Sequence, residues 1–230
     1  MPTGSDWNYL ESWKTYNPDY HHVYYNDKDM EDFIHQHYRP YFSYFISLAP
    51  VYRSDFFRYL IIQHFGGIWS DIDTECLKPF DHWLSLSEGN KVRAIIAVEL
   101  DGTGPIVDWF SLKLQFVQWT FAAVPYHPLI QHVINHILYR GYLKPLTAGP
   151  HTVTGPTIWT DAILDYFDKC CNIKSIDVFR RLVNPIIIGD VLVLPTTAFS
   201  PLNTSMGGRG RNHTLSLVEH KFQHSWHNKV

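Results

Sequence analysis

The stretch from Tyr52 to Cys76 constrains the fold of this chain more than any other. It reads YRSDFFRYLIIQHFGGIWSDIDTEC. Its first part predicts a helix, because apolar residues recur there at the spacing of one helical face. Ser54 is expected to cap this helix, and Asp55 to lie in its first turn, where the helix dipole favours a negative charge. The apolar face is expected to consist of Phe57, Leu60, Ile61 and Phe65.

A second face of the same helix is polar. Asp55, Arg58 and Tyr59 are spaced i, i+3, i+4, so their side chains lie on one side of the helix. Gly66 and Gly67 are expected to end the helix, because glycine adopts positive φ without penalty.

Two carboxylates follow the glycines. Residues 68–73 read IWSDID and predict a short strand, in which every second side chain points the same way. Asp71 and Asp73 should therefore converge, with Ile68 and Ile72 on the opposite side. Paired carboxylates suit Mn²⁺ or Mg²⁺, which can also bind a diphosphate. A lone Asp-x-Asp is usually a solvated loop, so the preceding helix and Gly-Gly turn carry the metal-site hypothesis.

This block resembles the DXD-containing glycosyltransferases of family 32, which have an R-x-D-x-x-R-Y helix before a G-G-I-Y-x-D-x-D strand. Within that family it is most similar to the fungal initiation-specific α-1,6-mannosyltransferases, which start outer-chain growth on N-glycans. The stretches 112–123, 154–166 and 191–226 add to a resemblance that covers about residues 17–226. The resemblance implies an α/β chain with a GT-A-like nucleotide-sugar-binding fold. Its central mixed sheet would be flanked by helices, with residues 1–230 forming one catalytic domain.

The resemblance also implies site residues. The tail VEHKFQHSW is similar to the family's V-x-H-x-F-x-G-S-W ending, and His220 occupies the position of a metal ligand. The implied ligands of Mn²⁺ or Mg²⁺ are Asp71, Asp73 and His220. The implied donor-binding residues are Asp55, Arg58, Tyr59, Asp71, Ser225 and Trp226. The catalytic candidates are Asp71 and Asp73, together with Glu99 and Asp101 on the acceptor side. Thr154 and Gly155, at a predicted helix start, are further acceptor-side candidates.

The implied reaction moves mannose from GDP-mannose to the 6-hydroxyl of an N-glycan core mannose. Donor and product are both α-linked, so configuration would be retained. The resemblance implies the Golgi lumen as the location. The formal net charge of −3 argues against a broad nucleic-acid surface. The sequence contains no run of 18 apolar residues, so it predicts no transmembrane helix.

One feature of the family has no counterpart in this sequence. Family members carry an early strand, reading roughly I-P-K-I-I-H-Q-T-W, that begins the nucleotide-binding sheet. We therefore expect a recognisable fold with an open groove on the donor side, and weak or absent GDP-mannose binding by this chain alone. A segment such as residues 7–14 could replace that strand.

Three alternatives to this function remain open. An inositol-phosphoceramide mannosyltransferase belongs to the same family. Asp71-Ile72-Asp73-Thr74 also matches the D-x-D-x-T of aspartyl-phosphate phosphatases, with Gly189-Asp190 as a later motif. In those phosphatases, however, a longer apolar run precedes the first aspartate. The third alternative is an inactive carbohydrate-binding relic.

Outside the central block the patterns predict further elements. Strands are expected at 22–25 and 92–99, helices at 128–139 and 157–167, a strand pair at 186–194 and a loop at 77–91. Gly141 is expected to stop the first of these helices. His127, His132 and His136 lie on or beside that helix. Solvated or capping roles are favoured over zinc for them, because no Cys or carboxylate cluster accompanies them in the sequence.

Overall fold

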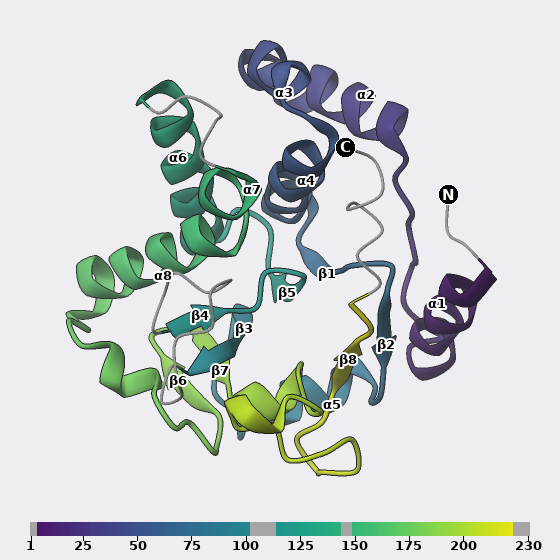
Figure 1. Cartoon of the computed structure of the whole chain (residues 1–230), viewed down its shortest axis with the longest axis vertical. Helices are drawn as coiled ribbons and strands as arrows, with labels where there is room; N and C mark the ends of the chain where they lie inside the picture. Colours follow the sequence, from purple (N-terminus) through teal and green to yellow (C-terminus); the bar gives the residue numbers. More distant parts are fainter. Residues whose placement is uncertain (1–3, 102–113, 144–148, 223–230) are drawn as a thin grey trace.

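The computed structural model describes residues 4–101, 114–143 and 149–222. A six-stranded sheet lies at its centre (Figure 1). Strand β3 runs parallel to β7, and the other pairs are antiparallel, so the sheet is mixed, as the sequence predicts. In spatial order the strands are β1 (Gly67–Ser70), β5 (Thr120–Ala123), β3 (Ala94–Asp101), β7 (Val191–Leu194) and β6 (Ile186–Ile188), with β4 (Leu114–Phe116) paired to the far end of β3.

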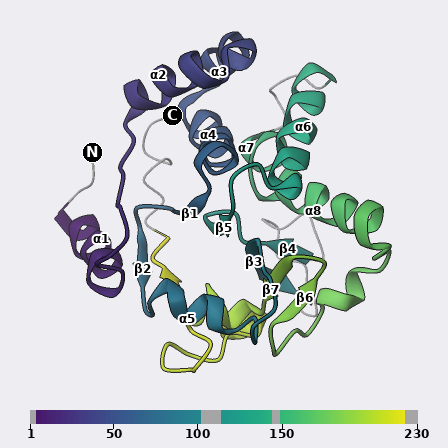
Figure 2. The same cartoon turned by 180° about the vertical axis from the view of Figure 1, so that it is seen from behind.

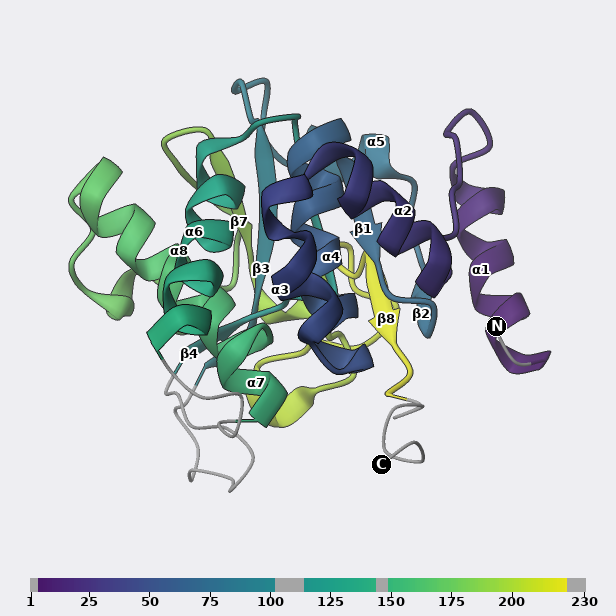
Figure 3. The ribbon, with the colours of Figure 1, turned by 90° about the horizontal axis from the view of Figure 1, so that it is seen from above.

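Helices and a second, two-stranded sheet surround the central sheet (Figures 1 and 2). Figure 3 shows α6, α8 and α4 together, with α1 at the opposite edge of the molecule. The α-helices are α1 (Gly4–Tyr16), α2 (Asp27–His37), α3 (Phe42–Ser47), α4 (Pro50–Phe65), α5 (Phe80–Ser85), α6 (Pro128–Leu143), α7 (Gly149–Val153) and α8 (Pro156–Cys171). Short 3₁₀ turns are η1 (Arg39–Tyr41), η3 (Ile176–Phe179), η4 (Thr196–Ala198) and η5 (Thr204–Met206). The second sheet pairs β2 (Thr74–Cys76) with β8 (Val218–His220).

The inner strand β3 is buried on both faces because its alternate side chains enter two different cores. In β3, Ile96 and Val98 pack into the core beneath α4, α6 and α8. Ile95 and Ala97 enter the other core, which contains Trp83 of α5. This burial explains why β3 opens with the apolar run from Ala94 to Val98.

Helix α4 begins earlier than the sequence predicts. Pro50 opens it, and Ala49 is the N-cap. Ser54 therefore does not cap the helix, and Asp55 lies beyond its first turn. Phe65 is 57% exposed, so its predicted place on the apolar face is wrong. The predicted end is confirmed: Gly66 has φ of 69°, and a Cβ there would lie 2.6 Å from Pro125.

Several other predicted elements are corrected. Residues 22–25 have no regular structure, and residues 77–91 contain helix α5. Residues 7–14 belong to α1 and therefore do not replace the family's early strand. Helix α6 continues past Gly141, where a Cβ would lie 2.3 Å from the Tyr44 hydroxyl oxygen and 2.6 Å from its ring. The hairpin at 186–194 is confirmed. None of the described helices is long and apolar enough to cross a membrane.

Candidate metal and nucleotide-sugar site

The Asp-x-Asp motif forms a turn between β1 and β2 and not the continuous strand that was predicted. Ser70 ends β1, and Thr74 begins β2. The backbone N–H of Asp71 donates to the carbonyl of Trp119 at 2.9 Å, and the Thr74 hydroxyl donates to the carbonyl of Asp71 at 2.6 Å. Ile72, at the tip, is 42% exposed and does not share a buried side with Ile68. The turn fixes both carboxylates by backbone contacts.

The C-terminal strand brings His220 to this turn. In the antiparallel pairing of β2 with β8, Thr74 lies opposite His220. The N–H of Lys221 donates to the carbonyl of Asp73 at 2.9 Å. As a result, Nε2 of His220 lies 3.0 Å from Oδ1 of Asp73, although 147 positions separate them in the sequence. The ligand atoms of Asp71, Asp73 and His220 all lie within 4.8 Å of one another.

The imidazole of His220 is held by aromatic rings. Trp119 stacks on it with ring centroids 4.5 Å apart, and Phe222 lies against it at 4.1 Å. Nδ1 of His220 is buried and has no hydrogen-bond partner within the described part of the chain. Two carboxylates and an imidazole in this arrangement fit a hard divalent cation such as Mn²⁺ or Mg²⁺.

Arg58 reaches this site from helix α4. Its Nη2 lies 3.0 Å from Oδ1 of Asp55 and 3.4 Å from Oδ1 of Asp71. The guanidinium also lies over the Trp69 ring at 5.7 Å, and Nε1 of Trp69 donates to Oδ1 of Asp71 at 2.8 Å. The Arg58 side chain is only 5% exposed, whereas that of Asp71 is 27% exposed. Arg58 and Trp69 therefore orient the Asp71 carboxylate from behind.

Asp55 is a buried carboxylate whose oxygens are used within the protein. Gln118 donates to Oδ1 at 3.0 Å, and Thr154 donates to Oδ2 at 3.1 Å. Burial raises the pKa of Asp55, against the opposing effects of Arg58 and these hydrogen bonds. Burial acts to lower the pKa of Arg58, but Asp71 and Asp55 together raise it, so the guanidinium stays charged.

Three of the predicted contact residues, Tyr59, Thr154 and Gly155, are buried in the protein. The Tyr59 side chain is wholly buried, stacked on Trp159 at 5.2 Å, and donates to Oε1 of Gln118 at 2.6 Å. The predicted direct contact of Tyr59 with a donor is therefore wrong. Thr154 is also wholly buried, and a Cβ on the buried Gly155 would lie 2.8 Å from the backbone of His151. These two residues join α7 to α8 beneath Asp55 and do not face an acceptor.

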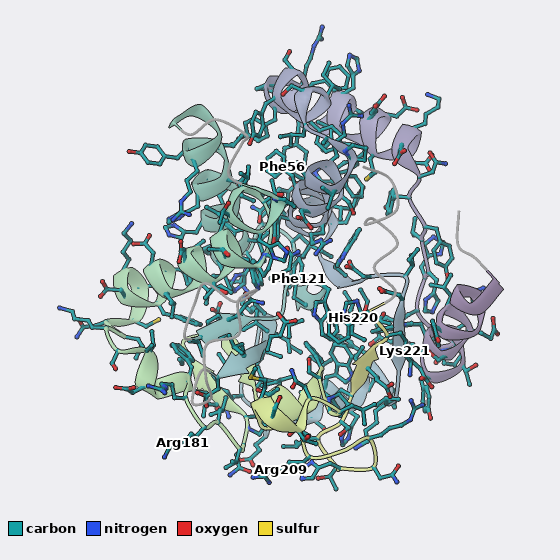
Figure 4. The ribbon with its side chains drawn as sticks, viewed as in Figure 1. Phe56, Phe121, Arg181, Arg209, His220 and Lys221 are labelled. Carbon is teal, nitrogen blue, oxygen red and sulfur yellow. The ribbon has the colours of Figure 1, made fainter. Side chains whose placement is uncertain are left out.

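The two acceptor-side acids lie in different surroundings. Glu99 is buried and accepts from Gln115 at 2.8 Å and from Nε1 of Trp119 at 3.1 Å. Trp119, which donates to Glu99, is also the residue that stacks on His220. Asp101 is the last residue of β3, where Arg180 lies 3.5 Å away and the backbone N–H of Arg181 donates to it. Asp101 lines a pocket there with Arg181 and Arg209, which Figure 4 shows well apart from His220. Ser225 and Trp226 lie outside the described residues.

A cluster of charges holds β8 against β2 beside the site. Lys221 lies 2.8 Å from Glu75, Arg211 donates to Glu75 at 2.8 Å, and both cations also pair with Glu219. Hydrogen bonds from Arg211, and then from Lys221, lower the pKa of Glu75 to about 2, although partial burial opposes them. His220 is the last residue of β8, and Lys221 follows it directly (Figure 4). The charge cluster and the group of Asp71, Asp73 and His220 thus both depend on the pairing of β2 with β8.

Two comparisons with known proteins agree with this geometry. A family model described as "Glycosyltransferase sugar-binding region containing DXD motif" matches residues 5–89, which include α4 and the Asp71–Asp73 turn. The chain is 35% identical over 235 residues to the initiation-specific alpha-1,6-mannosyltransferase of Schizosaccharomyces pombe, a match that covers 95% of this chain. The chain belongs to the DXD-containing glycosyltransferase family.

Other members of this glycosyltransferase family match less closely. The initiation-specific alpha-1,6-mannosyltransferase of Candida albicans is 32% identical over 95% of the chain. The chain spans 59% and 66% of the lengths of these two relatives. Inositol phosphoceramide mannosyltransferase 1 of Schizosaccharomyces pombe is 28% identical over 56% of the chain and 37% of its own length. A solved structure named PaToxG Glycosyltransferase covers 72% of this chain and 65% of its own at 16% identity, with a TM-score of 0.49, a likeness too low to bear on function.

The site of this glycosyltransferase includes residues that sequence patterns did not single out. Gln118 joins Tyr59 to Asp55, and Trp119 joins Glu99 to His220. Both lie in the 112–123 stretch, whose resemblance to the mannosyltransferases was the available signal. Periodicity gave no sign of them, because Gln118 and Trp119 precede β5 and contact the site from a loop.

Proposed function

We propose that this chain transfers mannose from GDP-mannose to the 6-hydroxyl of an N-glycan core mannose, with retention and with Mn²⁺ or Mg²⁺ at Asp71, Asp73 and His220. The observation that carries the proposal is the convergence of these three side chains across the β2–β8 pairing. The similarity to relatives named initiation-specific alpha-1,6-mannosyltransferase supports the choice of sugar and linkage. The same resemblance supports the Golgi lumen as the place of this reaction.

Each residue of the site has a distinct part in the proposal. Asp73 and His220 would hold the cation directly, and Asp71 would bind between the cation and the donor sugar. The bound cation supplies Lewis-acid stabilisation for the diphosphate leaving group. Arg58 keeps Asp71 oriented and adds positive charge beside the phosphates, in a geometry suited to its planar fork. Asp55 acts by holding Arg58, because both of its oxygens are engaged within the protein.

The reaction exchanges one bond at the anomeric carbon for another. The bond from that carbon to the diphosphate oxygen breaks, and the bond to the acceptor 6-oxygen forms. The proton of the acceptor hydroxyl passes to the departing diphosphate, so the products are the mannosylated acceptor and GDP. Retention by same-face attack needs no protein nucleophile. Glu99 does not fit a nucleophile, because its carboxylate is buried and bonded to Gln115 and Trp119.

A second acceptor follows from the relatives. Mannosyl phosphorylinositol ceramide synthase CSH1 of Saccharomyces cerevisiae is 35% identical over 61% of this chain, and Asp71 and Asp73 would serve its named reaction equally well. The chain covers only 32% of that relative, against 59% of the Schizosaccharomyces pombe alpha-1,6-mannosyltransferase. The broader similarity favours the N-glycan acceptor.

The phosphatase alternative lacks support in the geometry. Strand β1 has four residues and lies at the edge of the sheet, with β5 as its one strand neighbour among the described residues. Asp190, the second phosphatase motif, lies in the β6–β7 turn, where it pairs with Arg93 at 3.5 Å and His127 at 3.3 Å. Its partners there belong to a different part of the molecule from the Asp71–Asp73 turn.

The test is a transfer assay with two acceptors. The chain is incubated with GDP-mannose and Mn²⁺, together with either an N-glycan core oligosaccharide or inositol phosphoceramide, and the product linkage is determined by NMR. We expect an α-1,6-linked mannose on the oligosaccharide, and its loss in Asp73→Asn. Mannose on the inositol ring would establish the second acceptor. Tight carbohydrate binding without release of GDP from either mixture would indicate an inactive binding protein.

A further inference from the structure

A second cluster of metal-binding side chains lies away from the proposed transfer site. His132 and His136 stand one turn apart on α6, and Asp165 meets them from α8. Their ligand atoms lie within 4.8 Å of one another. The prediction that these histidines are only solvated or capping overlooked this carboxylate, because it comes from 33 and 29 residues further along the chain. His127, in contrast, does cap α6, since its Nδ1 accepts from the N–H of Leu129 at 3.2 Å.

We propose that His132, His136 and Asp165 form a structural site for a zinc-like divalent cation that ties α6 to α8. Both histidines present Nε2 to the same oxygen, Oδ2 of Asp165, at 2.7 and 3.0 Å. Ligand atoms held 2.0–2.2 Å from a tetrahedral zinc stand about 3.3 Å apart. Each Nε2 atom therefore needs to move only about half an ångström or less from Oδ2 to reach that spacing. Histidines at i and i+4 on one helix are also the spacing found in helical zinc sites.

The hydrogen bonding of Asp165 points to a cation as well. Oδ2 receives three donors at once, because Nζ of Lys169 lies 2.7 Å from it in addition to the two imidazoles. A single divalent cation beside Oδ2 can take the place of the protons that these three groups donate. Lys169 is the competitor, and its side chain is 65% exposed. An exposed lysine can turn into solvent at small cost, since surface ion pairs contribute little to stability.

The ligand set separates this site from the proposed catalytic one. Two imidazoles and one carboxylate favour zinc and its neighbours, whereas Asp71 and Asp73 with one imidazole suit Mn²⁺ or Mg²⁺. The side chains of His132, His136 and Asp165 are 21, 26 and 33% exposed, so an ion can enter from solvent, and water can complete its coordination. Three protein ligands and an open position are compatible with zinc.

The consequence for the fold is a second clamp between α6 and α8. Arg140 and Asp161 already join the same two helices at 2.6 Å, one helical turn from the histidines. This ion pair gives a matched control, because Arg140→Gln weakens the same helix contact and leaves all three proposed ligands in place.

The experiment titrates the folded chain with Zn²⁺, and in parallel with Co²⁺, in a large excess of Mg²⁺ that occupies the proposed catalytic site. Calorimetry gives the stoichiometry, the visible spectrum of Co²⁺ reports tetrahedral coordination, and a thermal scan reports stabilisation. We expect one Zn²⁺ per chain and a rise in melting temperature of about 5–10 °C at saturating Zn²⁺. His136→Gln should weaken binding by about 10-fold or more, and Arg140→Gln should leave the affinity unchanged.

Two further variants keep the proposal falsifiable whatever the stability of His136→Gln. Lys169→Met removes the competitor, so it should tighten Zn²⁺ binding, and Asp73→Asn should retain the Zn²⁺ site. Absence of Zn²⁺ binding in the wild type would overturn the proposal. So would equal affinity in His136→Gln, or loss of the Zn²⁺ site in Asp73→Asn.

Discussion

Replacing Arg58 by lysine tests whether the buried guanidinium orients the Asp-x-Asp carboxylates. Arg58 makes three polar contacts at once: 3.0 Å to Asp55, 3.4 Å to Asp71 and 3.3 Å to the carbonyl of Gln118. A lysine ammonium is a single point charge and cannot span these partners as the planar guanidinium does. We expect it to follow the nearer Asp55 and to leave Asp71 held by Trp69 alone.

The magnitude follows from the burial of the pair. Removing one partner of a buried ion pair costs about 3–5 kcal/mol, and lysine retains the charge, so we expect a loss of about 2 kcal/mol in the free energy of unfolding. For a chain of this length that loss lowers the melting temperature by about 4–8 °C. Transfer should fall by about 100-fold, because misplacing a group that positions the reacting atoms costs about that much.

The matched control is Arg53→Lys in the same helix. Arg53 also makes several contacts, to the carbonyl of Leu48 at 2.8 Å, to the carbonyl of Ile46 at 2.6 Å and to Glu31 at 2.7 Å, but none of them belongs to the site. Arg53→Lys should lower the melting temperature and leave the transfer rate of the folded protein unchanged. The assay is GDP release from GDP-mannose, below the melting temperature of each variant. Arg58→Lys with a rate within about twofold of wild type would make Arg58 a purely structural ion pair and refute the reasoning.

Two further predictions concern stability. The pKa of Glu75 is lowered to about 2 from the usual 4.5, so its ion pairs stabilise the fold fully above pH 4.5 and lose that effect as the pH falls toward 2. Urea unfolding should therefore show Glu75→Gln less stable by about 1 kcal/mol at pH 7, with a difference that shrinks through this window; a difference independent of pH would contradict the account. Gly66 and Gly149 both have φ of 69°, but only at Gly66 would a Cβ meet Pro125, at 2.6 Å. Gly66→Ala should cost more than Gly149→Ala, by about 1–3 kcal/mol, and equal losses in thermal unfolding would show that Pro125 yields without cost.

The sequence predicted the motifs better than their surroundings. The Asp71–Asp73 pair, the Gly-Gly helix end and the hairpin at 186–194 are local patterns, and local patterns can be recognised along a chain. Resemblance to the family placed His220 beside Asp73, which spacing alone could not do across the intervening chain. Tyr59 was misassigned because helical periodicity shows which residues share a face but not whether that face meets a ligand or a core.

The contacts that close over long sequence separations were not predictable from patterns. Gln118 reaches Asp55, and Asp165 reaches His132 and His136, only because α4, α6 and α8 pack together on one face of the sheet. The expectation of weak GDP-mannose binding stays a prediction. It is consistent with β1 lying at the edge of the described sheet, while residues 4–16 form a helix whose Trp13 donates to the carbonyl of Thr74 at 3.2 Å.

The most direct test of the central claim is a titration with Mn²⁺ alone, in which electron paramagnetic resonance measures the free ion. We expect one Mn²⁺ site, weakened by about 10-fold or more in Asp73→Asn and in His220→Gln. His132→Gln should leave it intact, because that histidine belongs to the other cluster. Mn²⁺ binding that is as tight in Asp73→Asn and His220→Gln as in the wild type would show that the Asp71–Asp73 turn and β8 do not form the metal site.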